Sequence, residues 1–432
     1  MLDSRRRVRC PPTVAQVLVI ISVACAPSLA GVTSVHSDFE SDPSAEGWGS
    51  TTPLGDPGNQ WTSEDSHSGT HSLRVEEGLW VSPIIDLEPF EYYSISLQTR
   101  MSGSGYYGPS YKTTTLYADG TEWNSNVSVF RGRHDRAETR IYFRPSTGGP
   151  GYLDDVVIEP IGRGQATAIL DERWSSQAPL ATGVGQASNP NLRRTFRALE
   201  NGENMRVVML GDSIVDDMSH SYFELFLERM YPGARIDVVT STRNSTGCWW
   251  FRETEPETGI PRVTTWVTDF APDLVLIGGI SHGQGGLQAE IDATRDVIEQ
   301  IRAWNADTDI LLVTPVGGTM DPRERPHLLD RADPDGPDWR ARLYRLAMSE
   351  HVGYLDMTTL WARHIESTGR PTSAFLRDSI HLNERGAAVA GRILETWFSP
   401  ERKSRPGRSR GDSPRRSVAG RAGRIHDSGG ER

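Results

Sequence analysis

The stretch MRVVMLGDSIVDD, residues 205–217, decides how the second half of the chain folds. Its apolar run is typical of a buried strand, and Gly211-Asp212-Ser213 is typical of a tight turn that leads into a helix. Asp and Ser are favoured helix N-caps, so this pair could simply begin the helix. Alternatively, Ser213 is a nucleophile at the positive end of that helix, which requires a base, an orienting acid and oxyanion donors elsewhere in the chain.

Apolar strands and amphipathic helices alternate along residues 203–399, which is typical of a doubly wound α/β fold with a parallel sheet. The expected strands cover 205–210, 234–239, 273–279, 309–315 and 353–357, and the expected helices cover 221–233, 261–272, 287–304, 339–351, 358–368 and 386–398. Ligands of such sheets bind beyond the carboxyl ends of the strands. Ser213 follows the first of these ends, so we expect a site there.

Residues 36–160 have a different composition, with short alternating runs rich in Gly, Ser, Thr, Tyr and Trp. Many short strands separated by turn residues predict an all-β sandwich that precedes the α/β domain. Its aromatic side chains could form a platform for sugar rings or fill the core, and they are Trp48, Trp61, Trp80, Tyr106, Tyr107, Tyr111 and Trp123. For any single one of them, the pattern favours the core.

A second candidate motif, LRDSIHLN at residues 376–383, lies directly before the last expected helix. The spacing of Asp378 and His381 lets the carboxylate bind Nδ1 of the imidazole, which leaves Nε2 free to act as a base. Alone, Asp378 could equally be a turn or cap residue. In the company of Gly-Asp-Ser after the first strand, the motif becomes a much rarer combination that points to nucleophilic catalysis.

Through these two motifs, residues 203–399 resemble the SGNH (GDSL-type) hydrolases, a family of esterases with a flavodoxin-like fold. The sequence GDSI matches the family's first block, and the resemblance implies Ser213 as nucleophile and its N–H as an oxyanion donor. The sequence DSIHLN matches the last block, which implies His381 as general base and Asp378 as the residue that orients it.

The same resemblance places the rest of the oxyanion hole on two further segments. Gly247, in RNSTGCWW after the second strand, fits the second block, where a bare Gly N–H approaches the substrate oxygen. The third block departs from the usual Gly-x-Asn, because residues 279–281 are Gly-Ile-Ser. Loss of one oxyanion donor costs about 100- to 1,000-fold in rate in other acyl-transfer enzymes. Two alternatives are open: Ser281 donates directly or through water, or His282 takes the role.

Two segments near these motifs could shape a pocket. Trp249 and Trp250 lie two and three residues after Gly247, so we expect them to wall the pocket, either as packing residues or as a surface for a sugar ring. The connection 316–337 is long for an α/β unit, which fits either a lid over the site or a surface loop without function.

The two ends of the chain resemble a targeting segment and a solvated tail. Residues 1–30 combine a basic start, an apolar run too short to span a membrane and an A-x-A-like end. This pattern predicts a signal peptide and a secreted, periplasmic or cell-surface protein, with a lipid anchor at Cys25 as the second choice. Residues 161–202 are expected to be a linker with a lead-in helix, and residues 400–432 a disordered basic tail.

Composition argues against several classes of function. The chain has a net charge of −11 although its last segment is basic, and so acidic a body would repel nucleic acid. If Cys10 and Cys25 leave with the signal, Cys248 is the one remaining thiol and no intramolecular disulfide can form. The sequence has no Cys/His cluster with zinc spacing, so we expect neither a metal nor an organic cofactor.

These expectations combine into an exported serine esterase that removes O-acyl groups, foremost O-acetyl, from a polysaccharide or a small ester. The glycan follows from residues 36–160, which resemble the jelly-roll carbohydrate-binding modules through DFESDPSAEGW, SGTHSLRV and YLDDVVI. A lipid esterase or thioesterase would use the same triad. A non-catalytic glycan-binding protein would keep the sandwich beside a degenerate hydrolase domain. The acyl group and the oligomeric state are open.

Overall fold

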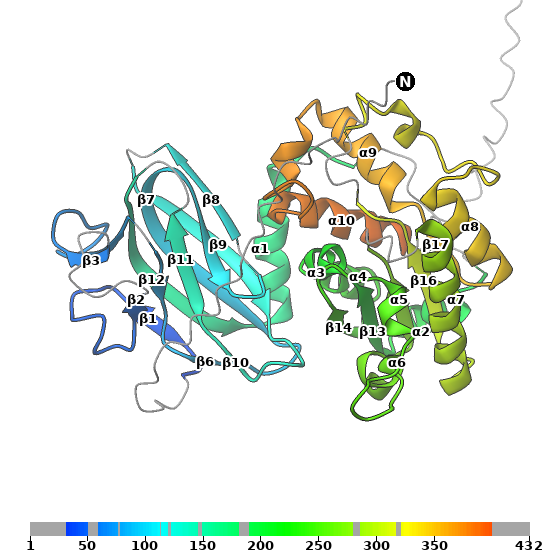
Figure 1. Cartoon of the computed structure of the whole chain (residues 1–432). Helices are drawn as coiled ribbons and strands as arrows, with labels where there is room; N and C mark the ends of the chain where they lie inside the picture. Colours follow the sequence, from blue (N-terminus) through cyan, green and yellow to red (C-terminus); the bar gives the residue numbers. More distant parts are fainter. Residues whose placement is uncertain are drawn as a thin grey trace, which may run out of the picture. The chain divides into compact units, whose positions relative to one another are not determined.

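A computed structural model of the chain describes residues 32–50, 59–76, 78–112, 114–119, 122–145, 149–180, 190–279, 286–316 and 321–399. The chain forms two compact units, Met1–Gln177 and Ala178–Arg432 (Figure 1). The predicted signal peptide and the basic tail lie outside the described residues. Within the described part of the chain, no helix is long and apolar enough to cross a membrane.

The first unit consists of antiparallel strands, and its long strand β7 (Tyr92–Pro109) takes part in two groups of them. The first half of β7 pairs with β12 (Gly151–Ile161) and β9 (Asn124–Arg131), and the second half pairs with β8 (Thr114–Asp119) and β11 (Ile141–Pro145). The shorter strands are β1 (Val35–Ser37), β2 (Gly49–Ser50), β3 (Asn59–Thr62), β4 (Ser72–Val75), β5 (Trp80–Val81), β6 (Ile85–Asp86) and β10 (Glu138–Thr139). The β-rich N-terminal part predicted from the alternating pattern is confirmed.

The core of this unit takes up several of the aromatic side chains that the sequence offers as a sugar platform. Trp48, Trp80 and Tyr107 are at most 4% exposed, as the packing alternative predicts. Trp61 differs, because its side chain is 37% exposed while its indole N–H donates a hydrogen bond to the carbonyl of Phe39 (2.7 Å). Its ring is therefore held in place at the surface.

Helix α1 (Arg163–Ser175) lies in the segment expected to be a linker with a lead-in helix, and it contacts β7 and β9 of the first unit. Ala166 is its one fully buried residue. The guanidinium group of Arg163 adds a contact, 5.4 Å from the centre of the Tyr92 ring. The unit consequently extends through Gln177, beyond the boundary at residue 160 that the sequence suggests. The pattern of α1 is too polar to reveal this packing.

The second unit is built around a parallel sheet with the strand order β14-β13-β15-β16-β17. The strands are β13 (Asn204–Gly211), β14 (Arg235–Thr242), β15 (Leu274–Ile277), β16 (Asp309–Val313) and β17 (Gly353–Leu355). Each of them lies in an apolar run of the sequence, and all four side chains of β15 are buried. The parallel sheet predicted from the strand and helix alternation is confirmed.

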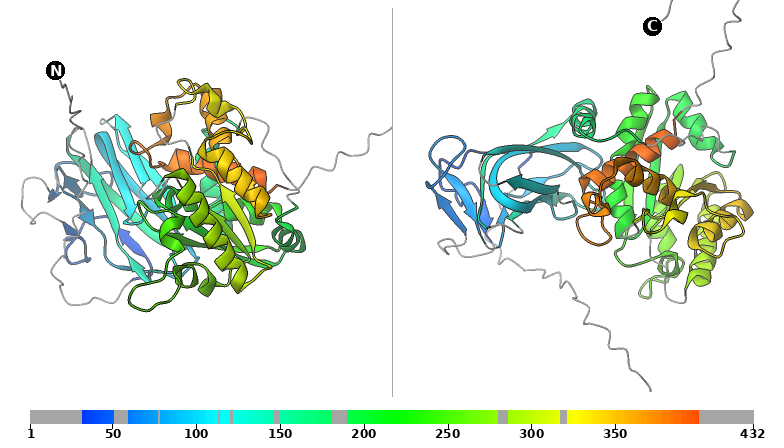
Figure 2. Two further views of the ribbon diagram at one scale, coloured as in Figure 1. Left: turned by 45° about the vertical axis from the view of Figure 1, so that its right-hand side comes forward. Right: turned by 90° about the horizontal axis from the view of Figure 1, so that it is seen from above.

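Helices flank this sheet, as Figures 1 and 2 show. They are α2 (Arg193–Asn201), α3 (Ser213–Ser219), α4 (Phe223–Met230), α5 (Cys248–Phe251), α6 (Arg262–Trp266), α7 (Leu287–Trp304), α8 (Trp339–Ser349), α9 (Met357–Thr368) and α10 (Glu384–Trp397), with short 3-10 turns η1 (Thr268–Phe270), η2 (Pro326–Leu329) and η3 (Thr372–Phe375). Helix α10 contacts α3, α4 and α9, whereas α7 contacts α5 and α8. Because β13 lies between β14 and β15, the loops after these three strands meet at one edge of the sheet.

Candidate active site

Ser213 is the first residue of α3, and the residue before it caps the helix. Oδ1 of Asp212 accepts a hydrogen bond from the N–H of Ile214 at 2.9 Å. The hydroxyl of Ser213 lies instead 2.9 Å from Nε2 of His381. The capping interpretation of Gly-Asp-Ser therefore applies to Asp212, which leaves the Ser213 hydroxyl available for the imidazole.

His381 and Asp378 lie on the loop between η3 and α10. Nδ1 of His381 is 2.7 Å from Oδ2 of Asp378, and Oδ1 of Asp378 accepts hydrogen bonds from the N–H groups of His381 (2.8 Å) and Ile380 (2.9 Å). The carboxylate thus binds both the ring and the backbone of the same histidine. The structure brings Ser213, His381 and Asp378 into one hydrogen-bonded row.

The charge of Asp378 follows from these contacts. Burial raises the pKa of its carboxyl, but the N–H groups of His381 and Ile380 and the imidazole outweigh burial, so the pKa lies below its ordinary value. An ionised carboxylate has no hydrogen to donate, so Nδ1 of His381 carries the shared one. Nε2 then has a free lone pair, and the Ser213 hydroxyl donates to it.

The backbone after β15 lies directly against Asp212, the residue that precedes Ser213. Gly279 has a φ of +121°, a conformation that favours glycine, and a Cβ there would lie 2.8 Å from Cγ of Asp212. Gly211 is equally confined, since a Cβ on it would lie 2.4 Å from the carbonyl oxygen of Gly278. Ser281 and His282 lie outside the described residues, so their part in an oxyanion hole stays a prediction.

Gly247 precedes α5, on the loop that follows β14. Its backbone is extended, with φ −147° and ψ −172°, so the requirement for glycine does not come from a left-handed conformation. A Cβ at this position would lie 2.4 Å from Oε1 of Glu290, a residue in the first turn of α7. The close approach of that carboxylate explains why position 247 is a glycine.

Glu290 is a buried carboxylate that the sequence analysis does not identify. It accepts hydrogen bonds from the N–H groups of Cys248 (2.6 Å) and Trp249 (3.4 Å), and it is 4% exposed. Burial raises the pKa of Glu290 to about 7, although these two N–H groups act in the opposite direction, and Asp212 contributes to the rise. One feature of the sequence could reveal this residue, because Glu290 lies on the apolar face of α7, next to Ile291.

The two tryptophans after Gly247 differ in their surroundings. Trp250 is 8% exposed, and the guanidinium groups of Arg243 and Arg262 lie 4.2 and 3.9 Å from the centre of its ring. It is a packing residue, which is the first of the two alternatives that the sequence offers. Trp249 is half-buried, and no described contact assigns it to a substrate.

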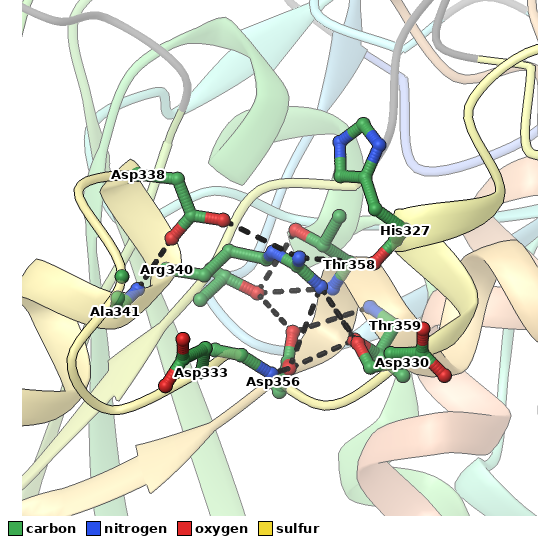
Figure 3. A network of polar contacts seen from close by, with 12 residues as sticks. His327, Asp330, Asp333, Asp338, Arg340, Ala341, Asp356, Thr358 and Thr359 are labelled. Carbon is green, nitrogen blue, oxygen red and sulfur yellow. Dashed lines mark hydrogen bonds and ion pairs between the residues drawn. The ribbon is translucent and has the colours of Figure 1, made fainter.

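The described parts of the connection 316–337 are fastened to α8 and α9 by Arg340, which is 7% exposed (Figure 3). The guanidinium group of Arg340 donates to the carbonyl oxygens of His327 (3.2 Å) and Asp330 (3.0 Å) and to the hydroxyl of Thr359 (2.9 Å), and it lies near the carboxylates of Asp338 (3.4 Å) and Asp356 (3.9 Å). The segment around η2 is therefore a fixed part of the second unit. Residues 317–320 lie outside the described ranges.

In the described ranges, no three His, Cys, Asp or Glu side chains come together as a metal site would require. Cys248 is buried and unpaired with another cysteine.

No protein-family model matches the chain, and no curated protein sequence matches it either. Solved structures with similarity to parts of the chain include a two-domain esterase active on acetylated mannans, with 13% identity and a TM-score of 0.38. The similarity covers 50% of this chain and 54% of the esterase, so the chain spans about half of the esterase's length.

Two further solved structures are similar to parts of the chain. A protein described as a GDSL-like lipase, from Parabacteroides merdae ATCC 43184, has 12% identity and a TM-score of 0.34 over 45% of this chain and 96% of its own. The C-terminal family 22 carbohydrate-binding module of a Clostridium thermocellum protein has 13% identity and a TM-score of 0.25 over 30% of this chain and 92% of its own.

Proposed function

We propose that this protein is a carboxylic ester hydrolase with Ser213 as nucleophile, His381 as general base and Asp378 as the residue that orients the base. One observation carries the proposal, the row of hydrogen bonds from Ser213 Oγ to His381 Nε2 (2.9 Å) and from His381 Nδ1 to Asp378 Oδ2 (2.7 Å). The strand order, in which the unit's first strand lies between its second and third, supports a flavodoxin-like doubly wound fold for the second unit.

The proposed reaction has two steps that use the same groups. Oγ of Ser213 attacks the ester carbonyl carbon while its proton passes to Nε2 of His381, and His381 then gives this proton to the leaving alkoxide. Water, deprotonated by His381, then attacks the carbonyl carbon of the acyl-enzyme. The bond from this carbon to Ser213 Oγ breaks, His381 returns the proton to Oγ, and the carboxylic acid leaves. The oxyanion binds the N–H groups of Ser213 and Gly247, with Ser281 as a third donor.

For the substrate we propose an O-acetylated polysaccharide. The support is the β-rich first unit, whose sequence resembles carbohydrate-binding modules, and the surface position of the Trp61 ring, which a sugar could stack on. The separate periodicities of the two halves of the chain fit a binding unit joined to a hydrolase unit.

The test is the release of acetate from a panel of acetylated polysaccharides, together with hydrolysis of a short-chain aryl ester. We expect Ser213→Ala and His381→Ala to reduce both rates by about 10⁴-fold or more, and Asp378→Asn to leave some activity. Ser373→Ala, an exposed serine in η3, is the matched control and keeps the wild-type rate. A Ser213→Ala enzyme that retains most of its rate contradicts the proposal.

The same panel separates the alternatives. Hydrolysis of long-chain acyl esters or thioesters without acetate release from glycans assigns the triad to a lipid esterase. Glycan binding without hydrolysis of any ester assigns the chain to the non-catalytic binding proteins.

We further propose that the chain is exported and that its signal peptide is removed after Ala30. The basis is the sequence of residues 1–30 alone. Intact-mass measurement of the protein recovered from a secreting host tests this proposal, and a mature protein that still begins at Met1 contradicts it.

A further inference from the structure

Asp217 lies one helical turn after Ser213 on α3, and its carboxylate is almost fully buried, with the residue 5% exposed. A buried carboxylate on the helix that presents the nucleophile requires a compensating partner, because its transfer from water is costly. Its partners come from the loop that holds the other two members of the triad.

The two oxygens of Asp217 bind both ends of that loop. Oδ1 accepts a hydrogen bond from Nη1 of Arg377 at 2.6 Å, and Oδ2 accepts one from the N–H of Leu382 at 2.9 Å. Arg377 directly precedes Asp378, and Leu382 directly follows His381. One carboxylate thus fixes the D-x-x-H motif at the residue before it and the residue after it.

Arg377 closes the loop on itself as well. Its Nη1 also donates to the carbonyl of Leu382 (2.6 Å), and its backbone N–H donates to the carbonyl of His381 (3.0 Å). Asn383 stabilises the base of the loop separately, since its side chain donates to the carbonyls of Ala374 (3.1 Å) and Leu376 (3.3 Å). Asn383 therefore shapes the loop, whereas Asp217 ties the shaped loop to α3.

The charges around Asp217 suit this task. Burial raises the pKa of Asp217 to about 6, while Arg377 and His381 lower it and Asp216 adds to the rise. The carboxylate is consequently ionised at neutral pH and lies close enough to His381 to attract its positive form. A proton taken from Ser213 generates that positive form.

We propose that Asp217 is a positioning residue, which through Arg377 and the N–H of Leu382 holds Nε2 of His381 within hydrogen-bond distance of the Ser213 hydroxyl. This inference rests on the proposed ester hydrolysis. A misplacement of about 1 Å in a reacting group can cost about 100-fold in rate. Loss of the contacts between Asp217 and the loop therefore acts on kcat rather than on substrate binding.

The central experiment compares Asp217→Ala and Asp217→Asn in the full chain, with an aryl ester as substrate. Asp217→Ala removes both acceptors and lowers kcat by about 100-fold with little change in KM. Asp217→Asn keeps one acceptor oxygen, so its kcat falls less than that of Asp217→Ala. Asp216→Asn is the matched control, because this neighbouring acid accepts a hydrogen bond from the hydroxyl of Thr242 at 2.9 Å, and it keeps the wild-type kcat.

Two readouts separate positioning from general stability. The acid limb of the kcat/KM profile of Asp217→Asn moves to lower pH, since the positive imidazole has lost a neighbouring anion. Arg377→Met also lowers kcat, and the double variant loses little more than Asp217→Ala alone, because Asp217→Ala already removes the contact with Arg377.

Hydrogen exchange of the backbone amides in residues 376–383 provides a measurement that does not depend on turnover. Asp217→Ala increases exchange there, and Asp216→Asn does not. A wild-type chain that hydrolyses no ester contradicts the proposed function. Hydrogen exchange in residues 376–383 would still show whether Asp217 holds the loop in place. Wild-type kcat and wild-type exchange in Asp217→Asn and Arg377→Met overturn the inference, even if Asp217→Ala fails to fold.

Discussion

At the scale of single residues, the end of β13 assigns two tasks to two adjacent side chains. Asp212 accepts a hydrogen bond from the N–H of Ile214 at the start of α3, and the hydroxyl of Ser213 lies 2.9 Å from Nε2 of His381. Asp212 therefore caps the helix in place of Ser213, although serine is also a favoured N-cap residue. The consequence is that stability and reactivity at this turn can be changed independently.

Unfolding measurements can separate these two tasks. Asp212→Ala removes the cap and lowers the free energy of unfolding by about 1 kcal/mol, whereas Asp212→Asn, which keeps an acceptor, loses much less. Ser213→Ala changes it by less than about 0.5 kcal/mol, because its hydroxyl caps nothing. Urea unfolding of the full chain provides the values. A larger loss in Ser213→Ala than in Asp212→Ala would return the capping role to the serine.

The raised pKa of Glu290 predicts how the free energy of unfolding depends on pH. Between its ordinary pKa of 4.5 and about 7, the unfolded chain ionises this carboxyl while the folded chain keeps the proton. The folded state then binds more protons, so the free energy of unfolding falls as pH rises through this window. Glu290→Gln cannot ionise, so from pH 5 to pH 7.5 it should gain roughly 2 kcal/mol relative to the wild type.

Urea titrations of wild type and Glu290→Gln at both pH values check this expectation. Asp217 contributes a slope of the same sign to both proteins, because its pKa is also raised, and it cancels in the comparison. Two stability curves that run parallel from pH 5 to pH 7.5 would show that Glu290 ionises at its ordinary pKa.

The sequence predicts the three hydrogen-bonded residues Ser213, His381 and Asp378. It does not predict the two buried carboxylates that bind the loops around them. Asp378 and His381 are found from local spacing, and Ser213 from the strand before it. Asp217 and Glu290 resemble ordinary acidic residues of helices, and their roles depend on partners far along the chain. The Arg377 guanidinium is 160 residues from Asp217, and the N–H of Cys248 is 42 residues from Glu290. No local pattern records such pairings.

At the scale of elements, Arg340 turns the segment around η2 into a fixed structure. We expect Arg340→Met to lower the free energy of unfolding by about 3 kcal/mol, since it removes the hydrogen bonds of a buried guanidinium group to two carbonyls and a hydroxyl. Trypsin should then cleave within residues 321–338 much faster than in the wild type. Arg197→Met, which changes an exposed arginine on α2, is the control. Equal cleavage rates would mean that other contacts hold the segment.

The elements themselves vary in how well the sequence predicts them. The strands of the second unit come from continuous apolar runs, because both faces of a parallel sheet are buried. Helix α1 has the opposite character, since RGQATAILDERWS offers no continuous apolar face and just one residue is fully buried. Its attachment to β7 and β9 depends on contacts such as Arg163 over the Tyr92 ring, which composition does not reveal.

At the scale of the whole molecule, the extent of the first unit determines where the chain can be divided. A chain that begins at Ala178 should fold and hydrolyse an aryl ester at the wild-type rate, because it contains the complete second unit. A chain that begins at residue 161 should be less soluble, since α1 then exposes the side that contacts β7 and β9. Circular dichroism, solubility and ester kinetics of both truncations provide the test.

The same truncation tests the task of the first unit. If this unit binds glycan, the chain that begins at Ala178 should release acetate from an insoluble polysaccharide more slowly than the full chain, at equal aryl-ester activity. Equal release by both chains would remove the main support for a polysaccharide substrate.

The distance along the chain between Ser213 and His381, 168 residues, has a consequence for the timing of activity. Ser213 follows the first strand of the second unit, whereas His381 lies on the loop directly before the last helix, α10. The ribosome synthesises Ser213 long before His381, so, under the proposed function, a nascent chain or a fragment that ends before His381 should have no hydrolytic activity. During refolding, recovery of ester hydrolysis should then mark completion of the second unit rather than formation of its sheet.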